Sequence, residues 1–198
     1  MKEIDKILGA KEKILWEGNP KFLPYFFSSF IFSIFILIIM IPVSFPLFRG
    51  NINLLYSPFF WSGILLMVAS PLYSLLSYSY IHYAITNKRV IMQRGLIGRD
   101  FQMVDFDKIT NAEVNVGIID KLVGNSSGTI LISTAGTFVQ TRRGARPKPY
   151  GLVRIANPYD VFKLFKKVSH DIKTDIHYPN KLRPKSNPGY QTSYNPKK

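Results

Sequence analysis

The residue types that usually carry chemistry are sparse in this sequence. Its three histidines, His82, His170 and His177, lie far apart and form neither an HxH nor an HExxH spacing. The chain has no cysteine, which excludes a thiolate nucleophile, a cysteine-based zinc site and a disulfide framework. The sequence therefore predicts no metal site and no cofactor.

One pair of carboxylates has a spacing that could serve catalysis. Asp105 and Asp107 lie two residues apart, on one face of a predicted strand. Paired carboxylates can do acid–base work, but the neighbouring Lys108 favours solvated charges at a strand edge. The segment RGLIGRD is not followed by GK[ST], and no GxSxG motif is present. We therefore expect a protein that is not an enzyme.

The chain is rich in basic residues, and four of them are clustered in one short segment. The chain has a formal net charge of +14, and residues 141–151 (TRRGARPKPYG) contain four bases and no acid: Arg142, Arg143, Arg146 and Lys148. Beside a bilayer, each such charge adds about 1 kcal/mol of attraction to anionic lipid headgroups. The alternative is a solvated connector that follows the general excess of cytoplasmic cations. The four residues are candidate lipid headgroup-binding residues.

A chain this basic could also bind nucleic acid, because phosphate backbones attract surfaces rich in lysine and arginine. The C-terminal half has the aromatic residues Phe101, Phe106 and Phe138 but no RNP-like basic-aromatic signature. For a domain tethered to a membrane, anionic lipid is the nearer source of phosphate. We expect no nucleic-acid partner.

Two long apolar segments dominate residues 22–81. No charged residue occurs from Phe22 to Phe48, and none from Pro58 to Tyr80. A helix needs roughly 20 apolar residues to cross the hydrocarbon core, so these segments predict a transmembrane hairpin with spans of about 24–47 and 58–80. The first segment is too long for a signal-peptide core and lacks an A-x-A-like cleavage site, so we expect it to be retained.

The distribution of lysine and arginine predicts the orientation of this hairpin. Five lysines precede the first span and four bases closely follow the second, whereas the connecting turn contains only Arg49. The positive-inside rule then places both termini in the cytoplasm of a multi-pass cell-membrane protein. Neither span contains Asp, Glu, Lys, Arg or His, so a transport pathway through the hairpin alone is not expected.

The segments on either side of the hairpin have different patterns. Residues 1–21 form a predicted cytoplasmic segment, and their apolar residues fit either a helix on the membrane surface or one packed on the following domain. Residues 82–170 contain short strand-like runs separated by turns, and then an amphipathic helix that begins near Pro158. Residues 171–198 are polar and rich in lysine and proline, which predicts a disordered basic tail.

The order of several short motifs resembles a known family. They are Tyr83 to Ile91 (YAITNKRVI), Arg94-Gly95, Ile97 to Arg99, Asp107 to Ile109, Val114 to Gly117, Ile119 to Gly124, Ile130 to Thr134 and Asn157-Pro158, with Glu12 to Pro20 (EKILWEGNP) before the hairpin. Together they resemble the bacterial pleckstrin-homology (PH) domains of the YdbS-like membrane proteins. The resemblance implies an α+β fold, in which a two-helix transmembrane hairpin precedes a PH-like, partly open β-barrel of two roughly orthogonal sheets with a C-terminal capping helix.

These observations predict a membrane-anchored PH-like module that works by binding. One hypothesis is an assembly, scaffolding or protein-interaction module at the cytoplasmic membrane face, which binds itself or another membrane protein through exposed strand edges and forms an oligomer. The alternative is a sensor or binder of anionic lipid headgroups that uses the basic segment. In both, the lipid bilayer itself is a partner.

Overall fold

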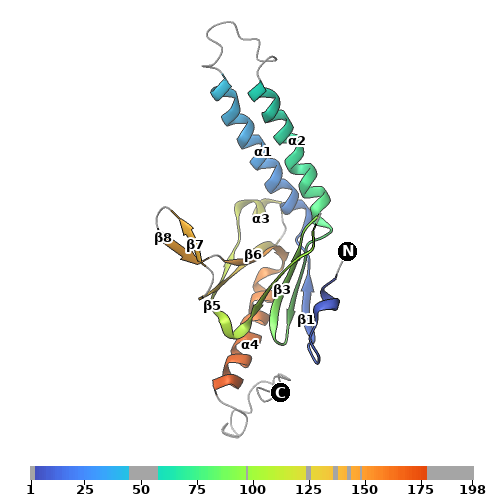
Figure 1. Cartoon of the computed structure of the whole chain (residues 1–198), viewed down its shortest axis with the longest axis vertical. Coiled ribbons are helices and arrows are strands. Elements are labelled where there is room, and N and C mark those ends of the chain that lie inside the picture. Colours follow the sequence, from blue (N-terminus) through green and yellow to red (C-terminus); the bar gives the residue numbers. More distant parts are fainter. Residues whose placement is uncertain are drawn as a thin grey trace.

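The computed structural model describes residues 3–44, 58–96, 98–123, 126–135, 138–141, 144–147 and 149–177. The fold is α+β: a pair of long helices projects from one end of a domain built from antiparallel sheets and a long C-terminal helix (Figure 1). Three of the four candidate basic residues, Arg142, Arg143 and Lys148, lie outside the described residues.

The projecting helices are α1 (Phe22–Ser44) and α2 (Pro58–Tyr78), which pack against each other along their length (Figure 1). Within the described residues, one segment is long and apolar enough to cross a membrane, Trp61–Tyr78 in α2. The apolar stretch found in α1, Phe22–Ile36, is shorter than a span requires. One of the two predicted spans thus has the required length and hydropathy, and the second remains a prediction.

The hairpin is inserted between two neighbouring strands of one sheet. This sheet has the order β1-β2-β3-β4, with β1 (Ile14–Gly18), β2 (His82–Thr86), β3 (Arg89–Arg94) and β4 (Asp100–Asp105). All its pairs are antiparallel, and Trp16 in β1 lies opposite Ile85 in β2. The chain therefore completes one strand of the domain, forms the hairpin, and returns to the adjacent strand.

A second antiparallel sheet has the order β5-β6-β9, with β5 (Ile109–Asn115), β6 (Ser127–Thr134) and β9 (Tyr150–Ala156). The turn η4 (Phe106–Lys108) joins β4 to β5, and the short helix α3 (Ile118–Leu122) precedes β6. The strands β7 (Phe138–Thr141) and β8 (Gly144–Pro147) form a separate hairpin. No strand pair joins the two larger sheets into a closed barrel within the described residues.

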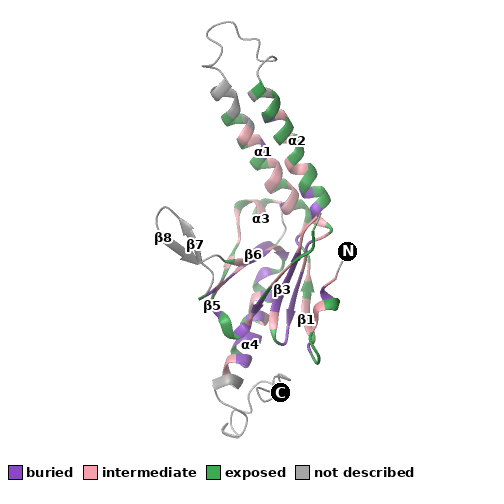
Figure 2. Cartoon of the chain, viewed as in Figure 1, coloured by how far each residue is buried: buried purple, intermediate pink, exposed green. Residues whose placement is uncertain are grey.

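The core lies between the two sheets and the helix α4 (Pro158–His177) (Figure 2). Apolar residues of α4 recur every three or four positions and enter this core, which places one face of the helix against the strands. These residues are Val161, Phe165, Val168 and Ile172. The rings of Phe106 and Phe165 lie 5.5 Å apart between their centroids.

The length of α4 corrects the prediction that a disordered tail begins at residue 171. The helix continues to His177, and Ile172 is only 2% exposed. Lys173 Nζ also donates a 2.7 Å hydrogen bond to the carbonyl of Ile109. Residues 171–177 are mostly polar, but Ile172 falls in register with the preceding core positions of α4. The rest of the predicted tail, residues 178–198, lies outside the described residues.

Two further predicted boundaries also change. The domain does not begin at residue 82, because β1 belongs to its first sheet and η1 (Ile4–Ile7) packs on the same sheet through the buried Ile4. The sequence left open whether the N-terminal segment lies on the membrane surface or on the following domain. In the structure it packs on the domain. The predicted basic loop contains the strand β8, so residues 144–147 are paired with β7.

Candidate functional site

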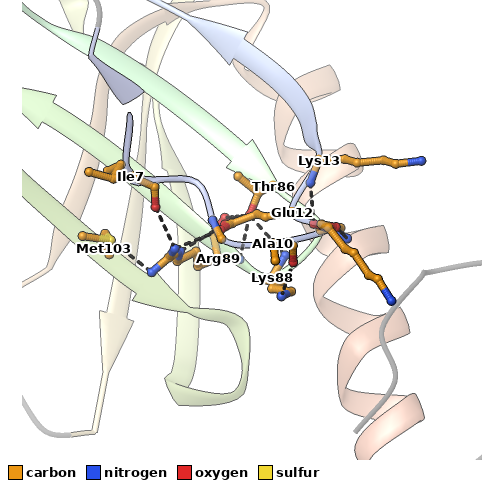
Figure 3. Close-up of polar contacts among 11 residues, drawn as sticks. Ile7, Ala10, Glu12, Lys13, Thr86, Lys88, Arg89 and Met103 are labelled. Carbon is orange, nitrogen blue, oxygen red and sulfur yellow. Dashed lines mark hydrogen bonds and ion pairs between the residues drawn. The ribbon is translucent and has the colours of Figure 1, made fainter. Parts of the chain in front are cut away.

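The N-terminal segment is fastened to the domain by a buried carboxylate. The side chain of Glu12 is fully buried and accepts hydrogen bonds from Arg89 Nε at 3.0 Å and Arg89 Nη2 at 2.8 Å (Figure 3). Thr86 Oγ1 donates to the same carboxylate at 2.8 Å, as does the backbone N–H of Gly9. Both carboxylate oxygens are used, which satisfies the charge that burial would otherwise penalise.

These contacts change the ionisation of both partners. Burial raises the pKa of Glu12, but the hydrogen bonds from Arg89, Gly9 and Thr86 outweigh it and leave this pKa below the usual value of 4.5. The hydrogen bond to Glu12 raises the pKa of Arg89. The pair is therefore a permanent ion pair at neutral pH, with a structural role rather than a role in proton transfer.

The two-residue turn between β2 and β3 supplies the rest of this attachment. Asn87 Oδ1 accepts from the backbone N–H of Lys13 at 2.9 Å, and the backbone N–H of Asn87 donates to the carbonyl of Lys13 at 3.1 Å. Lys88 Nζ donates to the carbonyl of Ala10 at 3.4 Å (Figure 3). The TNKR sequence at 86–89 thus holds the loop before β1, and with it the strand itself.

A second set of contacts holds the other end of β1, where the chain enters the hairpin. His82 Nδ1 and Asn19 Oδ1 are hydrogen-bonded at 2.9 Å, across the two connections between sheet and helices. The backbone N–H of Lys21 donates to the carbonyl of Arg154 at 2.7 Å. Tyr25 Oη in α1 and Ser77 Oγ in α2 lie 3.2 Å apart. The hairpin is therefore joined to the domain through short, hydrogen-bonded connections.

A cleft of about 370 Å³ opens beside β1, which is an edge strand of its sheet. Residues of β1 and its exit form one wall, and the end of β9 with the first turns of α4 forms the other. The lining residues are Trp16, Glu17, Gly18, Asn19, Ala156, Asn157, Asp160, Val161 and Leu164. A Cβ placed on Gly18 would lie 2.5 Å from the indole of Trp16, so the absence of a side chain there lets this ring lie across the strand.

The cleft combines an apolar floor with an acidic rim. Trp16 and Leu164 are partly buried against the core, and Val161 belongs to it. Glu17 and Asp160 are exposed, in a chain whose net charge is +14, and Asp160 forms a solvent-exposed ion pair with Lys163 at 3.5 Å. An open strand edge, an apolar floor and local negative charge together suit an extended peptide that has an apolar and a basic side chain.

A second cleft, of about 480 Å³, lies at the opposite edge of the first sheet, near β4. Asp105, one of the two carboxylates considered for catalysis, lines it and pairs with Lys108 at 3.0 Å. Asp107 is exposed on the adjacent turn. The ion pair with Lys108 agrees with the interpretation of these carboxylates as solvated edge charges.

The remaining sequence candidates are not brought together. His82 lies at the hairpin connection, His170 is exposed on α4, and the side chain of His177 is outside the described residues. Within the part of the chain that the structure describes, no cluster of three or more histidines and acidic residues could hold a metal ion. Arg146 is in β8, paired in register with Val139 of β7.

The features that make up the site were not found from sequence. Glu12 and Arg89 each lie in a motif that carried the family resemblance, but their partnership joins residues 77 apart. The cleft likewise combines positions near residue 17 with positions near residue 160. A local sequence pattern therefore predicts neither the Glu12–Arg89 pair nor the cleft.

Comparison with known families agrees with this architecture. Residues 22–168, which include both the helical hairpin and the sheets that follow it, match the Bacterial PH domain family. No curated protein and no solved structure matches the chain significantly. The matched region covers well over half of the sequence and nearly all of the elements described above. The chain belongs to the bacterial PH domain family.

Proposed function

We propose that this protein is a membrane-anchored, non-enzymatic PH-like module that binds an extended segment of a partner protein in the cleft between β1 and α4. The observation that carries the proposal is the insertion of the hairpin directly beside β1. The anchor and the cleft share that strand, so a partner seated there is held at a fixed place relative to the membrane. YdbS-like membership, suggested by the motifs, fits the same architecture.

The surfaces of both helices support the anchor. Large apolar side chains of α1 and α2 point away from the molecule, as the exposed residues along the hairpin show (Figure 2). Examples are Phe32, Phe35 and Ile38 in α1 and Leu65 and Val68 in α2, each more than half exposed. Continuous apolar surface of this kind needs a non-aqueous environment. With the excess of cations on both flanks, it supports a two-span hairpin with the domain in the cytoplasm.

The edge of β1 supplies the binding mode. An edge strand offers backbone donors and acceptors to an incoming extended chain, while neighbouring pockets select its side chains. We expect an apolar side chain of the partner to contact Trp16 and Leu164, and a basic one to face Glu17 and Asp160. Either another membrane protein or a second copy of this chain could supply such a segment, and the second case would make the protein an oligomer.

Binding of anionic lipid is the second candidate function, favoured by the position of Arg146. The hairpin β7–β8, whose strand β8 contains Arg146, projects from the side of the domain (Figure 1) and shares no residue with the cleft. Lipid contact there and protein contact at β1 are compatible with each other. Substitutions can distinguish lipid binding from protein binding, because the basic residues and the cleft residues are different.

Site-specific photo-crosslinking in native membranes tests the cleft. A photoreactive residue in place of Asp160 should give a discrete adduct, whose mass shows whether the partner is a second copy or another protein. Glu17→Lys in the same chain should lower the yield, because it reverses the charge of the rim. A photoreactive residue in place of Asp107, and the substitution Asp107→Lys, are the matched controls at an exposed acidic residue that does not line the cleft. Equal yields from positions 160 and 107 would contradict the proposal.

A further inference from the structure

The short helix α3 carries two of the most exposed apolar side chains in the described part of the chain. Ile118 is 77% exposed and Leu122 is 80% exposed. They lie four residues apart, so they share one face of the helix, and Lys121 lies exposed beside them. Residues of this size are rarely left in water together without a partner.

The position of α3 indicates what covers this face. The helix lies at the end of the domain from which the hairpin projects, against the first turns of α1 (Figure 1). The aromatic rings of Phe22 and Tyr78, at the domain ends of α1 and α2, pack edge to face at 5.2 Å. Aromatic residues favour the level of the lipid headgroups, so α3 lies beside that level.

The opposite side of α3 is anchored by a buried carboxylate. Asp120 is 4% exposed and lies between Ile118 and Leu122 in sequence, so it points to the other side of the helix. Ser127 Oγ donates to Asp120 Oδ1 at 2.7 Å, Arg154 Nη1 donates to the same oxygen at 3.1 Å, and the backbone N–H of Gly117 donates to Oδ2 at 3.2 Å. These bonds hold the apolar pair outward.

Arg154 also connects this anchor to the hairpin. Its guanidinium binds Asp120 under α3, while its carbonyl accepts the N–H of Lys21, which immediately precedes α1. Its backbone has a φ of 53°, a left-handed conformation that is uncommon for a residue other than glycine. One residue thus fixes the height of α3 relative to the first helix of the hairpin.

We propose that α3 is a second membrane contact, which inserts Ile118 and Leu122 into the headgroup and upper acyl region of the same bilayer that holds the hairpin. Lys121 and Lys21 then lie at the level of the lipid phosphates, where their charge favours anionic lipid. The inference rests on the proposed anchoring, and it adds a site that fixes the tilt of the domain on the membrane. This face is separate from the cleft beside β1.

Single-cysteine labelling of the full chain tests this site, because the native sequence has no cysteine. Ile118→Cys, Leu122→Cys and Asp107→Cys would each receive a nitroxide label, in nanodiscs of phosphatidylcholine with phosphatidylglycerol that contain one chain per disc. The measurement is the ratio of accessibility to oxygen, which partitions into lipid, and to a water-soluble nickel reagent. We expect this ratio to be at least several-fold higher at positions 118 and 122 than at 107, where the exposed turn faces water.

The outcomes separate the inference from the anchoring on which it rests. Resistance of the chain to alkaline extraction from membranes tests the anchoring alone, and a chain released by alkali would overturn both. A chain that stays embedded while its labels at 118, 122 and 107 are equally open to the nickel reagent would overturn only the α3 contact. Protection that appears in discs with two chains but not with one would assign the face to a second copy, which also contradicts the proposal.

A variant of the anchoring carboxylate provides the second measurement. Asp120→Asn retains the size of the side chain but removes the charge that binds Arg154. We expect it to reduce the lipid protection of the label at position 122 while the hairpin stays embedded. Lys121→Ser should lower the preference for phosphatidylglycerol over phosphatidylcholine and leave insertion in place. Unchanged protection in Asp120→Asn would contradict the role of Asp120 in holding α3.

Discussion

Arg89 Nη2 lies 2.8 Å from the buried carboxylate of Glu12, and this contact joins the segment before the inserted hairpin to the segment after it. Glu12 precedes β1, and Arg89 begins β3, so the ion pair closes a loop of the chain that contains both long helices. The ion pair thereby helps to hold β1 in the first sheet, although the hairpin separates β1 from β2 in the sequence. The cleft beside β1 depends on this closure, because β1 forms one of its walls.

Removal of either partner should destabilise the domain. Glu12→Gln leaves a partly buried guanidinium without its counter-charge, and Arg89→Met leaves the fully buried carboxylate without a counter-charge. Breaking a buried ion pair in this way costs about 3–5 kcal/mol, and we expect the lower end of that range because Arg89 retains 24% exposure. Denaturant unfolding in detergent would be followed by Trp16 fluorescence in a Trp61→Phe background, which leaves one tryptophan.

The ion pair of Lys108 with Asp105 provides the matched control for that experiment. Its two side chains are 68% and 46% exposed, so water already screens the attraction between them. Lys108→Met should leave the unfolding midpoint unchanged. If Lys108→Met lowered the stability as much as Arg89→Met does, burial of the Glu12–Arg89 pair would not explain the effect of Arg89→Met.

The same pair predicts a pH dependence with a defined sign. The folded pKa of Glu12 is lowered below its usual 4.5 because the hydrogen bonds from Arg89, Gly9 and Thr86 outweigh the effect of burial. The ionised carboxylate therefore favours the folded state above about pH 4.5, and this contribution is lost as the pH falls through the folded pKa. The free energy of unfolding should decline below pH 4.5 more steeply in the native chain than in Glu12→Gln. Parallel curves would contradict the assignment.

Short-range elements of this fold were predictable from the sequence, whereas long-range partnerships were not. The RVIMQR run, with its β-branched Val90 and Ile91, matches β3 at both ends, and Pro158 begins α4 as its fixed φ favours. By contrast, β1 pairs with β2 across more than sixty intervening residues, so no local period could assign it. The exposed face of α3 depends on Asp120 meeting Ser127 and Arg154, which also lie on other elements.

Reporter fusions test the orientation predicted from the lysine and arginine asymmetry. Reporters placed before Lys2 and after Lys198 should both be cytoplasmic, and one inserted at Asn51 should be external. Opposite locations for the two terminal fusions would show an odd number of spans. Such a result would retain the span in α2 and exclude the two-span hairpin.

The basic segment provides a separate test of lipid binding. Substitution of Arg142, Arg143, Arg146 and Lys148 by serine in the full chain should reduce its preference for anionic over neutral nanodiscs, by at most roughly 4 kcal/mol at about 1 kcal/mol per charge. The preference of the native chain should also weaken with added salt, because screening shortens to about 8 Å at physiological ionic strength. An unchanged preference would identify the segment as a solvated connector. The Lys121→Ser variant is the matched comparison, since it changes a cation at α3 instead.

The last prediction concerns the end of α4. Removal of residues 171–198 should destabilise the domain strongly, because it deletes Ile172 from the core and the hydrogen bond from Lys173 to the carbonyl of Ile109. Removal of residues 178–198 alone keeps every contact of α4 described above and should leave the unfolding midpoint nearly unchanged. Ile172→Ala isolates the packing contribution, for which a cost of about 2–5 kcal/mol is expected at a fully buried site. Trp16 fluorescence in the Trp61→Phe background measures all three variants under the same conditions. Equal stabilities of the two truncated chains would mean that the last two turns of α4 add nothing to the fold, and that the domain does end near residue 170.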